Sequence, residues 1–415
     1  MTSPRVIWDE YGFSGNLYST EPIAATAEGR RLFLGRDDER ARIVRQLSGG
    51  ASVVALEGDT GVGRTSLATA AAYDASRWHR RGGPLFIPLR VRLGLRPHET
   101  RESFELRGLK AVANTLVDAA PMLRTHGRTL SAPASLDGVA DASLPELVDD
   151  WLEELFPSRA SGGVICVIDN LERLSDNDEA MRLLAPVRDS MLKRHGLRWI
   201  ICGSAGFVRA AQSNQWMSGV FLNPIQIEPL DSVVVPQVVA ARIEEMRSRA
   251  DATAPVSEAA FARLFTSIGR NLRFALNLAE RYAFDQDPNQ LKSLSCEELD
   301  ARFEAAILAE ADHVYAAHAS ELKTADWRVF DILLREKSGS CSAAEFTAFG
   351  YTVMPPLLIR INRTETAPLM TYSGNVGDKR NRTISVTDQG RLAYYFHLNG
   401  REQRTAALSA PVAHD

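Results

Sequence analysis

The run GDTGVGRTS at residues 58–66 decides the fold of this chain. It follows a short apolar run, Val53–Leu56, and opens a segment with helical spacing over Thr65–Ser76. Glycines let backbone N–H groups approach phosphate oxygens closely, and the positive end of the following helix attracts an anion. A strand, a glycine-rich turn and a helix in this order therefore predict a phosphate-binding loop. A glycine-rich turn that holds no ligand is the alternative.

The loop departs from the usual P-loop pattern at one position. Arg64 stands where the motif normally has lysine, and a broad planar guanidinium does not occupy the same pocket as a compact ammonium group. Thr65 is the expected magnesium ligand through its hydroxyl. We therefore expect the loop to bind nucleotide, with hydrolysis slowed.

A second apolar run, Gly163–Ile168, ends in an acid, Asp169. In P-loop enzymes a carboxylate at such a strand end lies beside the metal, and a second acid orients the attacking water. Asn170 stands where a catalytic glutamate often follows, so Glu172 is the nearest acidic candidate. An apolar strand that ends in Asp for purely structural reasons is the alternative.

Two further residues are candidate reporters of the nucleotide state. Ser204 follows the apolar run Trp199–Cys202, which would place a hydroxyl beside the γ-phosphate. Arg273 opens a helix in a later part of the chain, where an arginine can reach back to the nucleotide, and Arg270 is the alternate. A small residue at a strand end and a solvated arginine at a helix start are the alternatives.

Strands and helices alternate through the first half of the chain. Pro84–Val91 is another strand-type run, and helical patterns lie at Arg36–Leu47, Leu106–Ala119, Leu144–Leu155 and Asn177–His195. Continuous apolar runs are typical of parallel strands that are covered on both faces. The pattern predicts an α/β class, a P-loop NTPase core with a doubly wound parallel sheet.

The second half changes to helices, with patterns at Val235–Arg249, Ser257–Ile268, Leu272–Phe284 and Cys296–Ala317. From Thr324 onward the expected elements are helices at 326–336, 342–349 and 355–361, strands at 369–372 and 382–387, and a last helix from Gln389. Three helices followed by a β-hairpin are the order of a winged helix.

These patterns divide the chain into five parts. They are an N-terminal aromatic arm over 1–32 that lies extended on the next domain, a P-loop ATPase core over 33–232, a helical lid over 233–318, a winged helix over 319–405 and a tail over 406–415.

Composition excludes several classes of protein. With 415 residues, 45% hydrophobic and 24% charged, the chain is neither fibrous nor disordered. A net charge of -4 argues against a surface coated by nucleic acid. The four cysteines form no CxxC pair, and neither a signal peptide nor a membrane span is visible, so we expect a cytoplasmic protein without membrane contact. The histidines show no metal-ligand spacing, which leaves nucleotide-bound magnesium as the expected metal.

Together these motifs resemble the AAA+ ATPases of the origin-recognition, or initiator, branch and their STAND-type relatives, over about residues 32–397. In that group a Gly-Arg-x-x-Glu box packs near the adenine, and residues 35–39 look like that box, while residues 269–273 resemble the sensor-2 motif. The resemblance implies ATP and Mg²⁺ as cofactors, and Arg209 is a candidate inter-subunit arginine finger. The residues expected to contact nucleotide are Gly35, Arg36, Gly58, Asp59, Thr60, Gly61, Val62, Gly63, Arg64, Thr65 and Ser66.

The winged helix carries the candidate DNA contacts. Residues 321–404 contain 12 Lys and Arg against 9 Asp and Glu, in a chain whose total charge is negative. Basic side chains at the hairpin tip and on the third helix can reach phosphates or a groove. They are Lys379, Arg380 and Arg382 at the tip, and Arg360 and Arg363, with Asn362, on the helix. The prolines at 355 and 356 keep that helix short, and winged helices also dock proteins, so a protein partner is the alternative.

We therefore expect an ATP-binding, slowly hydrolysing switch whose nucleotide state controls assembly and the binding of double-stranded DNA by the winged helix. A signalling or anti-phage defence scaffold, in which nucleotide drives homo-oligomerisation and the winged helix docks a protein effector, is the alternative. A third possibility is a protein that keeps its nucleotide permanently as a structural element.

Overall fold

The structure, a computed structural model, describes residues 7–78, 82–125, 130, 136–169, 171, 177–204, 206–362, 368–373 and 382–400. The chain divides into two compact units. Residues 22–228 form one, called here the P-loop unit. Residues 1–21 and 229–415 form the other, called the helical unit. The chain therefore starts in the helical unit, passes through the whole P-loop unit and returns.

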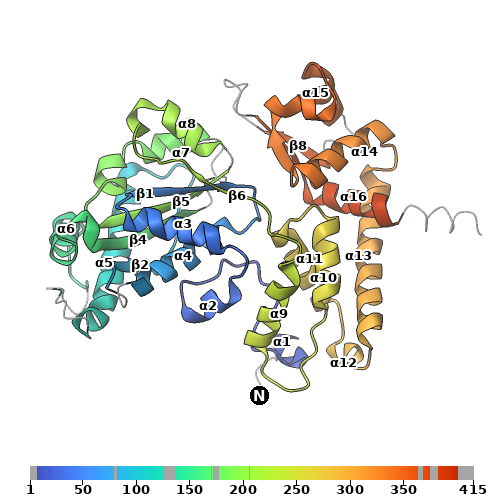
Figure 1. Cartoon of the computed structure of the whole chain (residues 1–415), viewed down its shortest axis with the longest axis horizontal. Coiled ribbons are helices and arrows are strands. Elements are labelled where there is room, and N and C mark those ends of the chain that lie inside the picture. The colour runs from blue at the N-terminus through green and yellow to red at the C-terminus, as the bar shows by residue number, and fades with distance from the viewer. Residues whose placement is uncertain are drawn as a thin grey trace, which may run out of the picture. The chain divides into compact units, whose positions relative to one another are not determined.

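The P-loop unit is built on a parallel sheet (Figure 1). Its strands are β1 (Val53–Gly58), β2 (Leu85–Pro88), β3 (Leu93–Gly94), β4 (Gly162–Asp169), β5 (Leu197–Gly203) and β6 (Ile225–Ile227). Their order is β2-β4-β5-β1-β6, and β3 pairs with β4. All of these pairings are parallel, which confirms the predicted sheet.

Alternate residues of each strand contribute to two separate cores. Val54 and Leu56 pack with α3 (Asp37–Ser48) and α4 (Arg64–Trp78). On the other face, Val53 and Ala55 pack with residues of the helices α5 (Arg101–Thr125), α6 (Leu144–Leu155), α7 (Asn177–Leu184) and α8 (Phe207–Ser213). Since successive side chains point to opposite faces of a strand, helices cover the sheet on both sides. The α/β fold class is thereby confirmed.

Smaller elements complete the P-loop unit. Helix α2 (Ala27–Leu32) begins after Thr26, whose hydroxyl accepts a hydrogen bond from the Gly29 N–H. Short 3₁₀ turns lie at Asp141–Ser143, Arg159–Ser161 and Gln215–Met217. The helix predicted over 177–195 is wrong in its second half, because α7 ends at Leu184 and a separate π-helical turn spans Arg188–Leu192.

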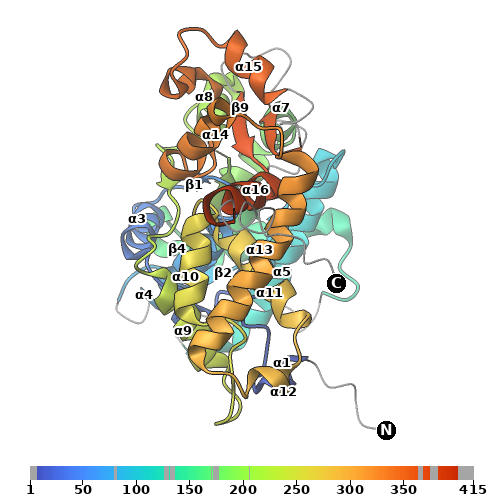
Figure 2. The ribbon, with the colours of Figure 1, turned by 90° about the vertical axis from the view of Figure 1, so that its right-hand side faces the viewer.

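The helical unit contains five helices between residues 235 and 318 of the described chain, and Figure 2 looks onto them. They are α9 (Val235–Met246), α10 (Glu258–Ser267), α11 (Leu272–Phe284), α12 (Pro288–Leu291) and α13 (Cys296–His318). Side chains at the helix starts accept hydrogen bonds from free backbone N–H groups, which explains these boundaries. These capping residues are Ser257, Asn271, Asp287 and Ser295.

Residues 7–21 of the predicted aromatic arm belong to the helical unit. Helix α1 (Ile7–Tyr11) opens it, and Tyr11 and Tyr18 are fully buried. The Tyr11 hydroxyl donates to the Ala283 carbonyl at 2.8 Å, and burial raises the pKa of both tyrosines. Buried Arg242 donates from Nη1 to the carbonyl oxygens of Leu17 and Ser19, and burial lowers its pKa to about 10. Residues 22–32 of the predicted arm instead belong to the P-loop unit, where Ile23 hydrogen-bonds to Ser66 and Thr69.

The end of the helical unit has the element order of a winged helix. Its helices are α14 (Thr324–Asp331), continued by a π-helical turn at Ile332–Glu336, a 3₁₀ helix at Ala343–Phe349, α15 (Pro355–Ile361) and α16 (Asp388–Asn399). Its strands β7 (Ser340–Ser342), β8 (Met370–Ser373) and β9 (Thr383–Val386) form an antiparallel sheet in the order β7-β9-β8. Strand β7 was not predicted, because a three-residue strand has no readable period.

Contacts made by α16 hold the winged helix against the helices that precede it in the sequence. The rings of Tyr315 in α13 and Phe396 in α16 lie 4.9 Å apart. Buried Arg391 donates from Nη1 to the carbonyl oxygens of Ile268 and Gly269, at 2.7 and 3.2 Å. A Cβ atom at Gly339 would lie 2.0 Å from the Arg391 guanidinium, so only glycine fits there. Among the described residues, none of the helices combines the length and the apolar character needed to cross a membrane.

Candidate functional site

The phosphate loop has the backbone that its glycines predict. Strand β1 ends at Gly58 and α4 begins at Arg64, and both Gly61 and Gly63 have a positive φ, of 89° and 95°. A Cβ atom at Gly63 would meet none of the described heavy atoms within 4 Å, so open space lies beside the loop. Backbone N–H groups at the start of a helix, next to an open glycine turn, suit a phosphate group. The loop therefore fits the nucleotide that the motif implies.

The first turn of α4 carries the residues expected around the phosphates and the metal. Arg64 and Thr65 are 5% and 6% exposed. The Ser66 hydroxyl accepts a hydrogen bond from the Ile23 N–H at 3.3 Å, and the Thr69 hydroxyl donates to the Ile23 carbonyl at 2.6 Å. Ser66 therefore also fixes the segment before α2. In the loop itself, the Val62 N–H donates to the Asp59 carbonyl at 3.4 Å, which closes the turn over Thr60.

Arg36 touches the phosphate loop directly. It follows Gly35, which has a φ of 76°, and its Nη2 donates to the carbonyl oxygens of Val62 and Glu228, at 3.0 and 2.6 Å. Its Nη1 pairs with Glu39 at 3.2 Å. Burial lowers the pKa of Arg36, and the nearby Glu39 carboxylate opposes that shift. The Gly-Arg box thus connects the loop with the last residue of the P-loop unit.

Strand order brings the other predicted residues to the same sheet edge. Strand β5 lies between β1 and β4, with Gly203 paired to Glu57 and Ile201 paired to Ile168. Asp169 and Ser204 therefore follow the carboxyl ends of strands neighbouring the loop strand, and Asp169 is 5% exposed. Crevices at the carboxyl ends of parallel strands are where open α/β sheets bind ligands.

Several predicted residues lie outside the described part of the chain. They are Glu172 and its neighbour Asn170, and the basic residues Arg363, Lys379 and Arg380. The backbone of Arg209 lies in α8, and its side chain is likewise outside the description. Among the described side chains, no group of three or more His, Cys, Asp or Glu residues is arranged to hold a metal ion.

The two sensor-2 candidates differ in their surroundings. Arg270 has an unusual positive φ of 59°, and its Nη2 donates to the carbonyl oxygens of Pro229 and Leu230, at 3.3 and 3.2 Å. Arg273 is exposed on the first turn of α11. Arg270 thus holds the segment that opens the helical unit, and a nucleotide contact by Arg273 stays a prediction.

Glu57 is a site residue that the sequence analysis missed. It is 3% exposed at the end of β1, directly before the first loop glycine. Its carboxylate accepts hydrogen bonds from the backbone N–H groups of Gly206 and Val208 and from the side chain of Gln226. An acidic residue inside an otherwise apolar strand run was visible in the sequence, since buried charges require partners.

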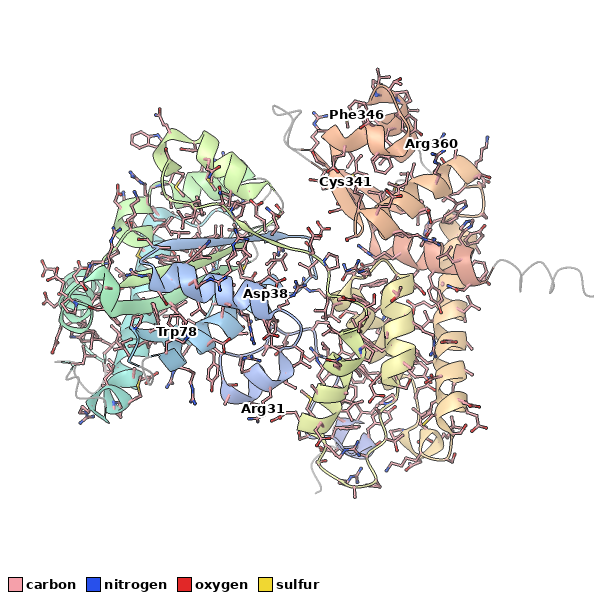
Figure 3. All side chains as sticks on the ribbon, viewed as in Figure 1. Arg31, Asp38, Trp78, Cys341, Phe346 and Arg360 are labelled. Carbon is pink, nitrogen blue, oxygen red and sulfur yellow. The ribbon has the colours of Figure 1, made fainter. Side chains whose placement is uncertain are left out.

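The two described basic candidates of the winged helix are held by their own domain. Arg360, labelled in Figure 3, lies in α15. It forms an ion pair with buried Asp326 of α14 and donates from Nε to the Tyr351 hydroxyl at 2.8 Å. Arg382 donates from Nη1 to the Tyr372 hydroxyl at 3.0 Å, and its guanidinium lies over the Tyr372 ring. Both contacts position the elements of the winged helix, and a DNA contact by either residue stays a prediction.

Among the described residues, the exposed side chains of α15 and its flanks are mostly apolar. Val353, just before the helix, is 55% exposed and Ile359 is 66% exposed. Pro355 and Pro356 are exposed as well, and so is polar Asn362. The described side chains of this part therefore offer few groups for hydrogen bonds to base edges.

Comparison with known proteins finds similarity in solved structures. No family model matches the chain, and no curated protein does. The Aeropyrum pernix ORC1 protein in complex with DNA is 14% identical, with 92% of this chain and 97% of that chain covered and a TM-score of 0.42. The Aeropyrum pernix ORC2 protein in ADPNP–ADP complexes is 10% identical, with 93% and 98% covered and a TM-score of 0.47. Drosophila ORC bound to DNA is 12% identical, with 95% and 93% covered and a TM-score of 0.42.

Proposed function

We propose that this protein is a switch that binds ATP and ADP with Mg²⁺ and hydrolyses ATP slowly. The observation that carries the proposal is the open glycine loop at 58–63, whose left-handed glycines precede the first turn of α4. Asp169 and Ser204 follow strands at the same edge of the sheet, which supports a site for a metal ion and a terminal phosphate there.

Each residue of the site has a role in this proposal. Backbone N–H groups of the loop would hold the phosphates, and the Thr65 hydroxyl and Asp169 would hold Mg²⁺. When bound, the metal would supply positive charge that offsets the charge of the phosphates. Arg64 adds positive charge with a guanidinium in place of an ammonium, which favours binding over turnover. Ser204 and Arg273 report the γ-phosphate, and Glu172 orients the attacking water.

Contacts of Arg36 and Arg270 support a connection between the phosphate loop and the segment that joins the two units. Arg36 holds Val62 of the loop and Glu228 at the end of the P-loop unit. Arg270 holds Pro229 and Leu230, the next two residues along the chain. A change in the loop on binding ATP would therefore reach the segment that joins the two units. Such a conformational response to nucleotide is what a switch requires.

Calorimetry with ATP and ADP in the presence of Mg²⁺ tests nucleotide binding. Gly138 is a matched control for Gly63. Both glycines have left-handed backbones, and a Cβ atom added at either would meet none of the described heavy atoms within 4 Å. Of the two, only Gly63 lies in the phosphate loop. We expect Gly63→Ala to lose affinity at least tenfold, because its methyl group enters the phosphate space, while Gly138→Ala binds like the wild type. The absence of heat with wild-type protein would refute the proposal.

For the output of the switch, we propose binding of double-stranded DNA through the winged-helix hairpin. Its support is the basic run at residues 379–382, together with the positive excess of this segment. Duplex binding should weaken with salt, differ between ATP and ADP, and fall when Lys379, Arg380 and Arg382 are replaced by Gln. Binding that ignores both the nucleotide and these three charges would exclude this output.

Docking of a protein partner is the second candidate output, and the apolar side of α15 favours it. Exposed apolar side chains are typical of protein contacts. If the docked partner is a second copy of this chain, replacing Val353 and Ile359 by Ser should reduce ATP-dependent assembly in sedimentation velocity and leave duplex binding unchanged. A loss of duplex binding in this variant would instead support DNA as the ligand of α15.

A further inference from the structure

The buried carboxylate of Glu57 has no role in the function proposed above. Register places Glu57 between Gly203 of β5 and Gln226 of β6. Its side chain is directed to the same side of the sheet as that of Gln226, whose Nε2 donates to Oε2 of Glu57 at 2.8 Å. Of the three described groups that donate a hydrogen bond to the Glu57 carboxylate, only the Gln226 amide is a side chain from a paired strand.

The other two donors belong to the turn that follows β5. The Val208 N–H donates to Oε1 of Glu57 at 2.6 Å, and the Gly206 N–H donates to Oε2 at 3.3 Å. Gly206 is the N-cap of α8 and has a left-handed φ of 85°. A carboxylate at this place satisfies N–H groups that the first turn of a helix leaves free. Glu57 thus acts as a remote cap for α8.

The capped turn lies close to Ser204. The Phe207 N–H donates to the Ser204 carbonyl at 3.2 Å, so the turn closes directly over this residue. A Cβ atom at Gly203 would come within 2.8 Å of the Phe207 ring, which shows how tightly the turn folds back onto β5. Any shift of the Gly206–Val208 backbone would therefore move Ser204.

We propose that Glu57 is a positioning residue that holds the Ser204 turn in register with the phosphate loop. Glu57 connects the phosphate loop with the Ser204 turn. Gly58, the first loop residue, follows Glu57 directly, and the Glu57 carboxylate accepts a hydrogen bond from the turn. The inference rests on the proposed function, in which Ser204 distinguishes ATP from ADP. Ser204 contacts the γ-phosphate in that scheme, and Glu57 acts only through the turn.

Hydrogen exchange in the nucleotide-free full-length protein tests whether Glu57 holds the Ser204 turn. Glu57→Gln places an amide N–H₂ group opposite donors, so at least one hydrogen bond to the turn is lost. Because a hydrogen bond to a charged group is broken, exchange of peptides covering residues 204–210 should become faster by roughly tenfold. Gln226→Ala, which removes the third partner without touching the turn, should leave those peptides unchanged. Wild-type protection in Glu57→Gln would overturn the inference.

Calorimetry with ADP and with a non-hydrolysable ATP analogue, each with Mg²⁺, tests the functional half. In Glu57→Gln, the analogue should bind about tenfold more weakly and ADP within about twofold of the wild type, because only the γ-phosphate contact is displaced. Ser204→Ala should show the same pattern. If Glu57 acts through Ser204, the double variant should be no weaker than either single variant, whereas additive losses would overturn that connection.

The outcomes separate this inference from the proposed function. Equal weakening of ADP and the analogue in Glu57→Gln would refute the positioning role while nucleotide binding itself stands. Wild-type protein that binds neither nucleotide would refute the proposed function and with it the nucleotide half of this inference. In that case the exchange experiment alone would decide whether Glu57 holds the turn.

Discussion

Arg64 is the residue at which this site departs most from the usual phosphate loop. It is the first residue of α4 and is buried, so its guanidinium is part of the site's interior. A planar guanidinium spreads its charge over a wider group than an ammonium and positions its donors differently. We therefore expect Arg64 to affect the transition state of hydrolysis more than the binding of phosphate.

We predict that Arg64→Lys raises the rate of ATP hydrolysis while nucleotide affinity changes little. A gain of at least about tenfold would correspond to about 1.4 kcal/mol of barrier. Single-turnover hydrolysis measured by quench-flow checks it, with Arg194→Lys as a control because Arg194 pairs with Asp149 away from the loop. Unchanged turnover in Arg64→Lys would show that Arg64 is not what limits hydrolysis.

Arg360 was predicted from sequence as a DNA contact, and the structure adds a stabilising role. Asp326 has a side chain only 3% exposed, so removing Arg360 would leave a buried carboxylate that keeps the hydrogen bond from the Lys323 N–H and loses the positive charge of its ion-pair partner. We predict that Arg360→Met lowers the free energy of unfolding of the helical unit by about 3 kcal/mol. Thermal unfolding checks it, with Asn362→Ala on the same helix as a control. A variant that lost DNA binding at full stability would favour the direct contact.

How far single residues could be predicted depends on the sequence distance of their partners. The loop glycines and Thr65 were recognisable because their roles are local to one strand, one turn and one helix. Glu57 was not, since its partners Gly206, Val208 and Gln226 follow it by about 150 residues or more and only the folded sheet brings them together. Arg360 looked available for DNA because Asp326, its partner, lies on another helix.

Among the elements, long periodic segments were predicted best. The bounds of α6, α11 and α15 agree with the sequence patterns, since each has an apolar face of helical period that ends at clear boundaries. The short strands β3 and β6 were missed because two or three residues show no period. Pairing with long neighbours stabilises such strands, and a single sequence does not display that pairing.

The arm and α9 give a prediction at the scale of elements. Arg242 of α9 is buried and donates to two arm carbonyls, so Arg242→Met leaves both without a partner. We expect the free energy of unfolding of the helical unit to fall by about 2–3 kcal/mol. Denaturant unfolding measures it.

Arg249 provides the matched control for this prediction. It also donates to arm carbonyls, those of Asp9 and Glu10, but it is exposed. Water can replace its hydrogen bonds, so Arg249→Met should cost under about 1 kcal/mol. Equal losses in the two variants would mean that burial does not set the strength of the arm contacts.

At the scale of the molecule, the division into two units predicts how nucleotide changes stability. Ligand that binds only the folded P-loop unit stabilises that unit, by about 2.7 kcal/mol at a concentration one hundred times Kd. ADP lacks the γ-phosphate that Arg273 of the helical unit contacts in the proposed scheme, so in scanning calorimetry ADP with Mg²⁺ should shift the transition of the P-loop unit upward. The transition of the helical unit should stay in place, and Gly63→Ala should show no shift. Transitions that move together would indicate one cooperative unit.

The sequence predicted the class of each half, because alternation of strands and helices gives way to helices alone near residue 235. It did not predict that the first twenty residues fold with the second half. Aromatic residues without a period indicate burial but do not identify the surface that buries them, and the surface here begins more than two hundred residues later.

The buried rings of the arm also form a noncovalent connection between the first part of the chain and α9–α12. The peptide chain crosses the unit boundary twice, after Glu21 and after Glu228. The arm that precedes the first crossing packs its buried rings among α9–α12. A protein severed at the second crossing would keep its halves together through the inserted rings of Trp8, Tyr11, Phe13 and Tyr18. Fragments 1–228 and 229–415, made as separate polypeptides, should accordingly reassemble by complementation.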